Sequence, residues 1–309
     1  MTRSRWIVSA AVILLVAYAA SRVDWREAGA ALARAALIPI IAAVVTNLLS
    51  VGLRGVRWWI FLRRVGPVPL ALAVRGAIVG SGFNNLLVAN GGDATRAVLV
   101  ARATGVAPAS VLATLALDRI FDPICFGLLL FVATFMISLP AQLASTRPFA
   151  GLVLFVVIAI LVLLVNTPAS DESTNAKGGW RARVRDFRRE IQILSTSRRF
   201  IAAMLVSASV WALQIIVFAL AARSVGLTLP LAGSIAAMLL TNTGLILRAT
   251  PGNVGYFQFA YAIAAGHFGV SADAAVATAL LLQLVQIVPV TLLALALAPR
   301  MMKPTSGAK

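Results

Sequence analysis

The chain has 309 residues, of which 61% are hydrophobic and only 12% charged, and its 27 Lys and Arg against 10 Asp and Glu give a formal net charge of +17. A soluble globular domain has roughly 45–50% apolar and ~25% charged residues, so the composition excludes that class. The basic excess would suit a nucleic-acid binder only on a soluble basic face, so we expect no nucleic-acid partner.

Long apolar runs predict an all-α, polytopic integral membrane protein. In chain order these runs cover 6–20, 36–62, 111–137, 149–166, 200–222 and 272–298. A helix needs about 20 such residues to cross the hydrocarbon core. The first run follows two arginines, like the charged start of a signal peptide, but no small-residue cleavage site comes after it. We therefore expect it to be retained, giving about six spanning helices.

Two further apolar regions, 76–100 and 231–268, are interrupted by polar and glycine-rich sequence. Each contains two short pieces around the interruption. Non-helical backbone at membrane depth is tolerated only where protein covers it or where it lines a cavity. The pattern therefore predicts two re-entrant helical hairpins in addition to the spanning helices.

The basic residues favour this topology. If both hairpins return to their side of entry, 18 of the 27 basic residues lie in four cytoplasmic segments: the N-terminus, 53–75, 167–199 and the C-terminal tail. If every broken piece crossed the membrane instead, the basic loop 167–199 would move outside, against the positive-inside tendency. We expect a bacterial inner-membrane protein with both termini in the cytoplasm.

The two halves of the chain look alike within a single membrane domain, 1–309. A shift of 164 residues aligns identical residues after the two broken regions, among them Gly105 with Gly269 and Thr114 with Thr278. We expect pseudo-repeats at about 1–140 and 148–300, with the basic loop 167–199 between the first two helices of the second. Three crossings per half would relate the repeats upside down, which is a transporter architecture.

Polar residues inside the apolar zone are costly, so each is a candidate for function. The first group, in the first broken region, is Asn84, Asn85, Gly91, Gly92, Asp93 and Arg96. The glycines allow a tight reversal, and the planar fork of Arg96 suits a phosphate. The alternative is structural: Asp93 caps the second short helix and pairs with Arg96 three residues later.

The second group lies early in a long apolar helix and comprises Asp118, Arg119 and Asp122, followed by Pro123. A pair between Arg119 and Asp122 within the helix would serve only to stabilise the bundle. Three buried charges exceed what stability needs, because desolvation offsets the pairing. We therefore also consider a role in substrate binding or proton transfer.

The third group is Arg248, Pro251, Gly252, Gly255 and Gln258, in the second broken region. It predicts a turn with an arginine near its start; the alternative is a loop at the membrane edge with Arg248 reaching the interface.

Elsewhere, Trp58 and Trp59 beside Arg57 are expected to form an aromatic belt above a basic face. The single cysteine and single histidine exclude a disulfide and disfavour a metal site, so we expect no metal and no cofactor.

These groups carry a family resemblance that covers nearly the whole chain. The stretches that carry it are Phe83-Asn84-Asn85-Leu86-Leu87, Gly91-Gly92-Asp93 with Arg96, Thr104-Gly105-Val106 and Leu117-Asp118-Arg119, with an Arg-x-x-Arg-Trp pattern at Arg54, Arg57 and Trp58. They resemble the transmembrane, flippase-like region of lysylphosphatidylglycerol synthases. In the second half, the turn at 250–257 is similar to that family's Pro-Gly-Gly-x-Gly turn. The chain departs from the family at Val88, Asn253 and Gln258, where the family often has Pro, Gly and Glu.

The resemblance implies transport of a lipid with an anionic, phosphate-bearing head group, or of an isoprenoid lipid, across the bilayer. The family's synthases carry a soluble transferase domain after the membrane part, so their activity is not carried over, and we expect no enzyme. The expected partners are membrane lipids, and a homo-oligomer stays open. Two alternatives are an embedded enzyme acting on lipid phosphate and an accessory subunit that recruits a partner through 167–199.

Overall fold

The computed structural model describes residues 25–86, 91–136, 148, 151–152, 155, 198–243 and 255–302, and all regular elements in these ranges are helices. The elements in chain order are α2 (Trp25–Ala33), α3 (Leu37–Leu62), α4 (Leu70–Leu86), α5 (Gly91–Thr104), α6 (Pro108–Met136), α10 (Arg198–Ser224), α11 (Leu231–Thr243), α12 (Tyr256–Gly266) and α13 (Ala272–Met302). The all-α prediction is confirmed for these ranges. The apolar runs 6–20 and, apart from isolated residues, 149–166 lie outside them, as does the loop 167–197.

The long helices match the apolar runs. Within the described ranges, three stretches are long and apolar enough to cross a membrane: Leu37–Leu62, Arg198–Ser224 and Ala272–Pro299. Helix α6 is equally long and continues through Pro123. The chain is therefore a membrane protein with several apolar helices, and a total of six spans remains a prediction.

Each broken region forms two short helices, as the sequence predicts. Helices α4 and α5 occupy the first region and α11 and α12 the second, so each half runs long, short, short, long. The second short helix of each half ends before a glycine with positive φ, Gly105 at 72° and Gly269 at 81°. Only glycine adopts this left-handed conformation without strain, which explains the identity of these two positions.

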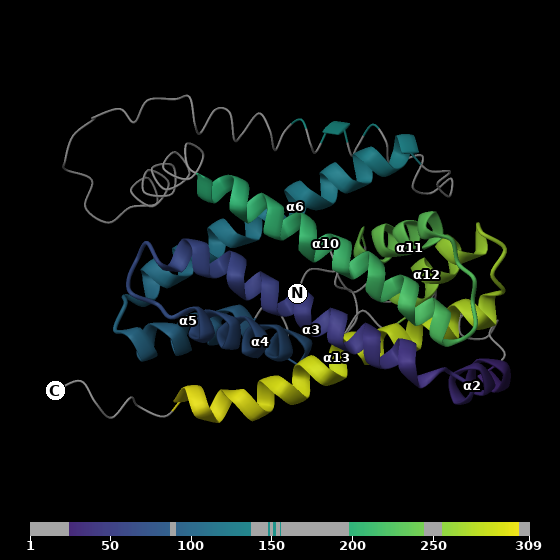
Figure 1. Cartoon of the computed structure of the whole chain (residues 1–309), viewed down its shortest axis with the longest axis horizontal. Coiled ribbons are helices and arrows are strands. Elements are labelled where there is room, and N and C mark those ends of the chain that lie inside the picture. Colours follow the sequence, from purple (N-terminus) through teal and green to yellow (C-terminus); the bar gives the residue numbers. More distant parts are fainter. Residues whose placement is uncertain are drawn as a thin grey trace, which may run out of the picture.

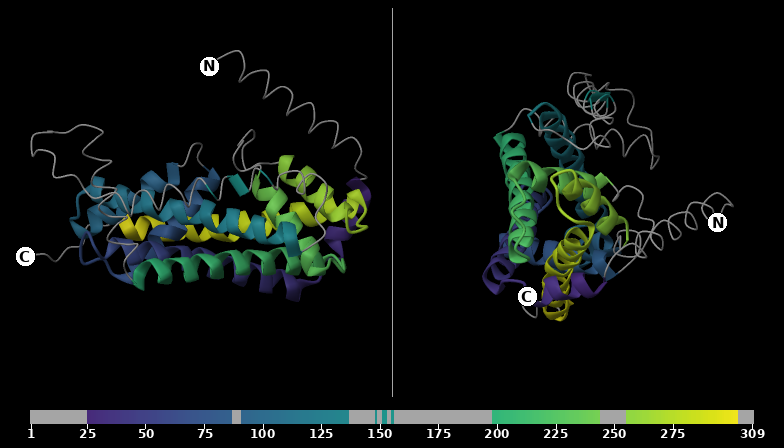
Figure 2. Two further views of the ribbon diagram at one scale, coloured as in Figure 1. Left: turned by 90° about the horizontal axis from the view of Figure 1, so that it is seen from above. Right: turned by 90° about the vertical axis from the view of Figure 1, so that its right-hand side faces the viewer.

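The two pairs of short helices lie at opposite ends of an elongated bundle (Figures 1 and 2). The α4–α5 pair lies where α3 ends and α6 and α10 begin, and the α11–α12 pair lies near α2. Helices α3 and α10 pack along each other between the two ends. The backbone N–H of Ala36 donates to the carbonyl of Ser224 over 2.7 Å, which ties the start of α3 to the end of α10.

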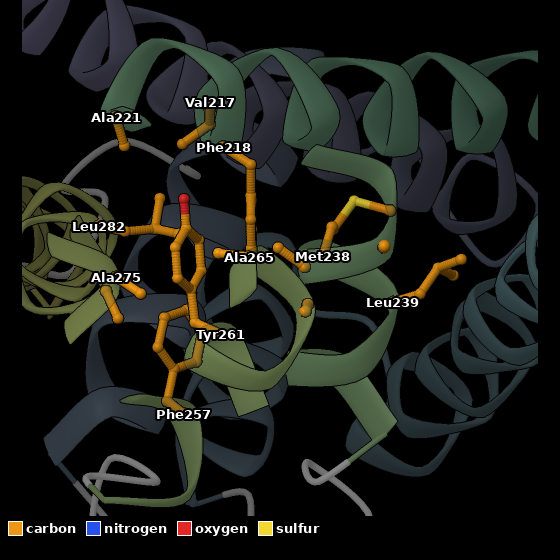
Figure 3. Packing of buried hydrophobic residues seen from close by; sticks show 14 of the residues in the cluster. Val217, Phe218, Ala221, Met238, Leu239, Phe257, Tyr261, Ala265, Ala275 and Leu282 are labelled. Carbon is orange, nitrogen blue, oxygen red and sulfur yellow. The ribbon is translucent and has the colours of Figure 1, made fainter. Parts of the chain in front are cut away.

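A separate apolar core surrounds each short pair. Around α11 and α12, the rings of Phe218 and Tyr261 stack with centroids 6.1 Å apart, next to Phe257 and Leu282 (Figure 3). Around α4 and α5, the core includes Trp58, Leu62 and Val100. Because α3 and α13 contribute to both cores, they hold the two ends of the molecule together.

Amide side chains join the long helices between these cores. Pro289 in α13 has no N–H to donate to the carbonyl of Val285. Asn47 of α3 donates to that carbonyl over 3.4 Å and to the carbonyl of Gln286 over 3.3 Å. Gln214 of α10 donates to Asn47 and accepts from Gln286. The network thus satisfies a backbone group that the proline leaves free.

Candidate functional site

Seven charged residues from three helices gather where α4 and α5 meet the bundle. We call them the charged cluster: Arg54 and Arg57 from α3, Asp93 and Arg96 from α5, and Asp118, Arg119 and Asp122 from α6. Five of these residues are among the candidates from the sequence. Arg54 and Arg57 are additions, and they bring the first and second candidate groups into one site.

Arg57 lies at the centre of the cluster with 1% of its side chain exposed. Its Nε is 2.7 Å from Oδ1 of Asp118, and its Nη1 is 2.7 Å from Oδ1 of Asp122. The same Nη1 donates to the hydroxyl of Ser207 in α10 over 2.9 Å. One guanidinium thus joins α3, α6 and α10, and its charge is met by two carboxylates.

Arg96 continues the cluster on the α5 side. Its Nη2 lies 3.8 Å from Oδ2 of Asp118, and its Nε lies 3.1 Å from Oδ1 of Asp93. The pair between Asp93 and Arg96, which the sequence offered as the structural alternative, is therefore confirmed. The guanidinium of Arg96 also lies over the ring of Trp58, 4.7 Å from its centroid. Gly80 makes room for this side chain, because a Cβ there would lie 2.6 Å from Cδ of Arg96.

The pair between Arg119 and Asp122, which the sequence offered as a structural alternative, is wrong. Arg119 pairs with Oδ2 of Asp93, on another helix, while Asp122 is held by Arg57. The residues thus form an alternating chain of opposite charges, Asp122–Arg57–Asp118–Arg96–Asp93–Arg119. Arg57, Asp118 and Arg96 are nearly buried, Asp93 is 18% exposed, and the two ends are more accessible, Asp122 to 25% and Arg119 to 44% of the side chain.

The prediction that Trp58 belongs to an aromatic belt is also wrong. This side chain is fully buried, and its indole N–H donates to the hydroxyl of Thr114 over 3.1 Å. Helix α3 ends at Leu62, as the apolar run 36–62 predicts, but Trp58 packs into the core with Leu62 and Val100. Arg54 and Arg57 therefore lie within α3, which overlaps the segment 53–75 that the topology count assigns to the cytoplasm.

Asn84 and Gly92 close the turn between α4 and α5. The N–H of Gly92 donates to Oδ1 of Asn84 over 2.9 Å, so Asn84 serves the start of α5, a role expected of Asp93. A Cβ on Gly92 would lie 2.0 Å from the carbonyl oxygen of Gly80, so the two helices touch here. Gly91 is the first residue of α5. Asn85 donates instead to Thr291 of α13 over 3.3 Å, away from the cluster.

The third candidate group lies apart from the charged cluster. Gly255, with φ at 90°, donates its N–H to Oε1 of Gln258 over 2.7 Å at the start of α12. Nε2 of Gln258 donates to Oε1 of Gln283 over 2.5 Å. Both described members of the group are neutral, and Arg248, Pro251 and Gly252 lie outside the described residues.

Two features of the sequence point to Arg54 and Arg57, which the three candidate groups did not include. Asn47, Ser50, Arg54 and Arg57 recur at spacings of three and four residues, which places them on one face of α3. The Arg-x-x-Arg-Trp resemblance covers the same arginines. No group of three or more His, Cys, Asp or Glu that could hold a metal occurs within the described ranges.

Comparison with known proteins adds one assignment. Residues 5–294 match the family model described as the lysylphosphatidylglycerol synthase TM region. No curated protein matches the chain. The family match covers far more than half of the sequence and includes the whole charged cluster. The chain therefore belongs to the lysylphosphatidylglycerol synthase TM region family, which indicates a membrane protein of lipid metabolism or transport.

Proposed function

We propose that this protein moves a lipid with an anionic, phosphate-bearing head group across the bacterial inner membrane. The observation that carries the proposal is the charged cluster, in which four arginines and three aspartates lie within helices of a membrane protein. Charged residues at membrane depth are rare and costly, and they generally mark a substrate or ion pathway. The surplus of arginine suits an anionic ligand.

The position of the cluster supports entry from one side. At a rise of 1.5 Å per residue, Arg57 lies about 8 Å from the end of α3 at Leu62, and Ser207 lies about 14 Å from the start of α10. Asp118 lies about 15 Å from the start of α6. These helix ends are those that the basic residues assign to the cytoplasm, so we infer that the head group enters from there.

The arrangement of the short helices also supports transport. Each half of the chain contributes one pair of short helices, and the pairs lie at opposite ends of the bundle (Figure 1). In an inverted repeat, two such pairs would enter from opposite sides, as alternating access requires. Two re-entrant hairpins in an inverted repeat are therefore part of the proposal.

The pairing of the carboxylates favours transport over chemistry on the lipid. Asp93, Asp118 and Asp122 each lie within ion-pair distance of an arginine, and a paired carboxylate is a poor general base. We accordingly propose that the protein is not an enzyme and that the lipid leaves with its mass unchanged.

A reconstitution experiment tests the proposal. The full chain is placed in phosphatidylcholine vesicles with a trace of fluorescently labelled phosphatidylglycerol, and a membrane-impermeant quencher reports the lipid that reaches the outer leaflet. We expect much faster exchange than in protein-free vesicles and no change in lipid mass. Equal exchange rates would refute the proposed function, and a new lipid mass would favour the enzyme.

Two arginines of similar exposure separate the cluster from general charge effects. Arg119→Ala removes the accessible end of the alternating chain, and we expect it to abolish exchange while the protein stays folded. Arg102→Ala removes an exposed arginine in the last turn of α5, away from the cluster, and should leave exchange intact. Full activity of Arg119→Ala would refute the role of Arg119.

A further inference from the structure

One positive charge of the cluster is left over. The alternating chain from Asp122 to Arg119 contains three carboxylates and three guanidinium groups, so it is neutral as a whole. Arg54 is the seventh member. Within the described ranges no carboxylate lies within ion-pair distance of Arg54, although Asp122, Arg57 and Arg119 are close enough for their charges to act on it.

The surroundings of Arg54 leave a hydrogen-bond donor unused. Its Nε is buried and has no hydrogen-bond partner among the described residues. Arg54 as a whole is only partly buried, so a ligand can reach its side chain although Nε is covered. A buried donor without an acceptor is destabilising, so such a group calls for a partner such as water, an ion or a ligand.

The accessible end of the cluster borders an apolar surface. Arg119 lies on the exposed face of α6, where Leu112, Ala116 and Pro123 are exposed at helical spacing around it. In a bilayer this face offers apolar contact for acyl chains next to charged groups. A ligand that combines a phosphate with acyl chains fits both features, whereas a free anion uses only one.

We propose that Arg54 is the anchor for the head group and that it selects a phosphodiester with a single negative charge. This inference rests on the proposed function and specifies its ligand. A monoanionic phosphodiester would offset the one surplus charge, and its two free oxygens match the guanidinium fork. A phosphomonoester carries close to two charges above pH 7 and leaves a net negative site. A zwitterionic head group brings its own cation toward four arginines.

Equilibrium binding to the detergent-solubilised full chain tests this assignment at pH 8. The probes are dihexanoyl forms of phosphatidylglycerol, phosphatidic acid and phosphatidylcholine, together with glycerophosphoglycerol, which is the head group without acyl chains. We expect phosphatidylglycerol to bind at least tenfold more tightly than each of the other three. Equal binding of phosphatidic acid would overturn the single-charge selection, and equal binding of glycerophosphoglycerol would overturn the lipid as the ligand.

The variant Arg54→Gln isolates the arginine. It should weaken phosphatidylglycerol binding at least tenfold and leave phosphatidylcholine binding unchanged, while the control Arg102→Gln changes neither. If Arg54→Gln does not fold, Arg54→Lys keeps the charge but not the fork, and it should still weaken phosphatidylglycerol binding several-fold. Unchanged binding in the folded variant would overturn the assignment.

The outcomes also separate this inference from the proposed function. Vesicle exchange by the wild-type chain with unaltered lipid binding in Arg54→Gln would refute only the role of Arg54. Absence of exchange in the wild type would refute the transport proposal itself, whatever the binding results.

Discussion

The contact between Arg57 and Asp118 predicts a strong coupling that a double-mutant cycle can measure. The single variants are Arg57→Met and Asp118→Leu, which keep much of the side-chain volume and remove one charge each. Breaking a buried ion pair by removing one partner costs about 3–5 kcal/mol, because the other charge stays buried. Both residues are almost inaccessible, with 1% and 3% of their side chains exposed, so that range applies here.

The contacts rank the two single variants. Arg57→Met removes two 2.7 Å carboxylate contacts and leaves Asp118 with Arg96 at 3.8 Å as its nearest partner. Asp118→Leu leaves Arg57 paired with Asp122 at 2.7 Å. We therefore expect Arg57→Met to lie near the upper end, about 5 kcal/mol, and Asp118→Leu near the lower end, about 3 kcal/mol.

The double variant should cost far less than the sum. It removes Asp118 and leaves Arg96 paired with Asp93, so only Asp122, which Arg54 influences from beyond ion-pair distance, loses its close partner. Replacing a whole buried pair with apolar side chains is often neutral or stabilising. The double variant should therefore cost no more than Arg57→Met alone, which makes the coupling energy at least about 3 kcal/mol.

Unfolding of the detergent-solubilised protein, followed by circular dichroism, measures these free energies. Far-UV circular dichroism is preferable to fluorescence, because Trp58 lies next to Arg57 in the chain and stacks on Arg96. Arg102→Met, in an exposed position, serves as a control and should change stability by less than about 0.5 kcal/mol. Additive losses in the double variant would refute the reasoning, since they would mean that the two residues do not act on each other.

Two further predictions concern the backbone around the site. Gly92→Ala should destabilise the protein by about 3 kcal/mol or more, because its Cβ would lie 2.0 Å from the carbonyl oxygen of Gly80, which is backbone and cannot move aside. In the control Gly127→Ala the added Cβ has nothing within 4 Å, so this variant should be neutral or slightly stabilising. Equal melting temperatures of the two variants would contradict this packing. Asn47→Leu should cost about 1–3 kcal/mol by leaving the Val285 carbonyl unpaired, and Pro289→Ala should shrink that cost by restoring the helix's own donor. An unchanged cost in the Pro289→Ala background would contradict the assigned role of Asn47.

The fold could be predicted largely because hydrophobic length is a strong signal. The runs 36–62, 200–222 and 272–298 correspond to α3, α10 and α13 within a few residues. The glycine-rich interruptions also separated the short helices correctly. Length and composition do not show which side chains of a helix are buried, so they predict the extent of α3 but not the burial of Arg57 and Trp58.

The candidate site was predicted in part for a related reason. Local spacing shows which residues share a helix face, and the pair Asp93–Arg96 follows from it. It cannot show partners on other helices, so Arg119 was matched with Asp122, three residues away, rather than with Asp93, 26 residues away. In a low-dielectric interior the packing of helices decides such pairings, and that information is absent from any single segment.

The alternating order of the charged cluster affects how the helices can move. Each inner residue touches two opposite charges, so it can release one partner while it still holds the other. In a shift of α5 relative to α6, Asp118 would keep Arg57 and Arg96 would keep Asp93, so of these six residues Arg119 alone, which is accessible, would lose its partner. An isolated ion pair has no such intermediate steps, because its separation exposes both charges at once. The alternating order therefore limits the charges that lose a partner when α5 moves against α6 to the accessible end of the cluster.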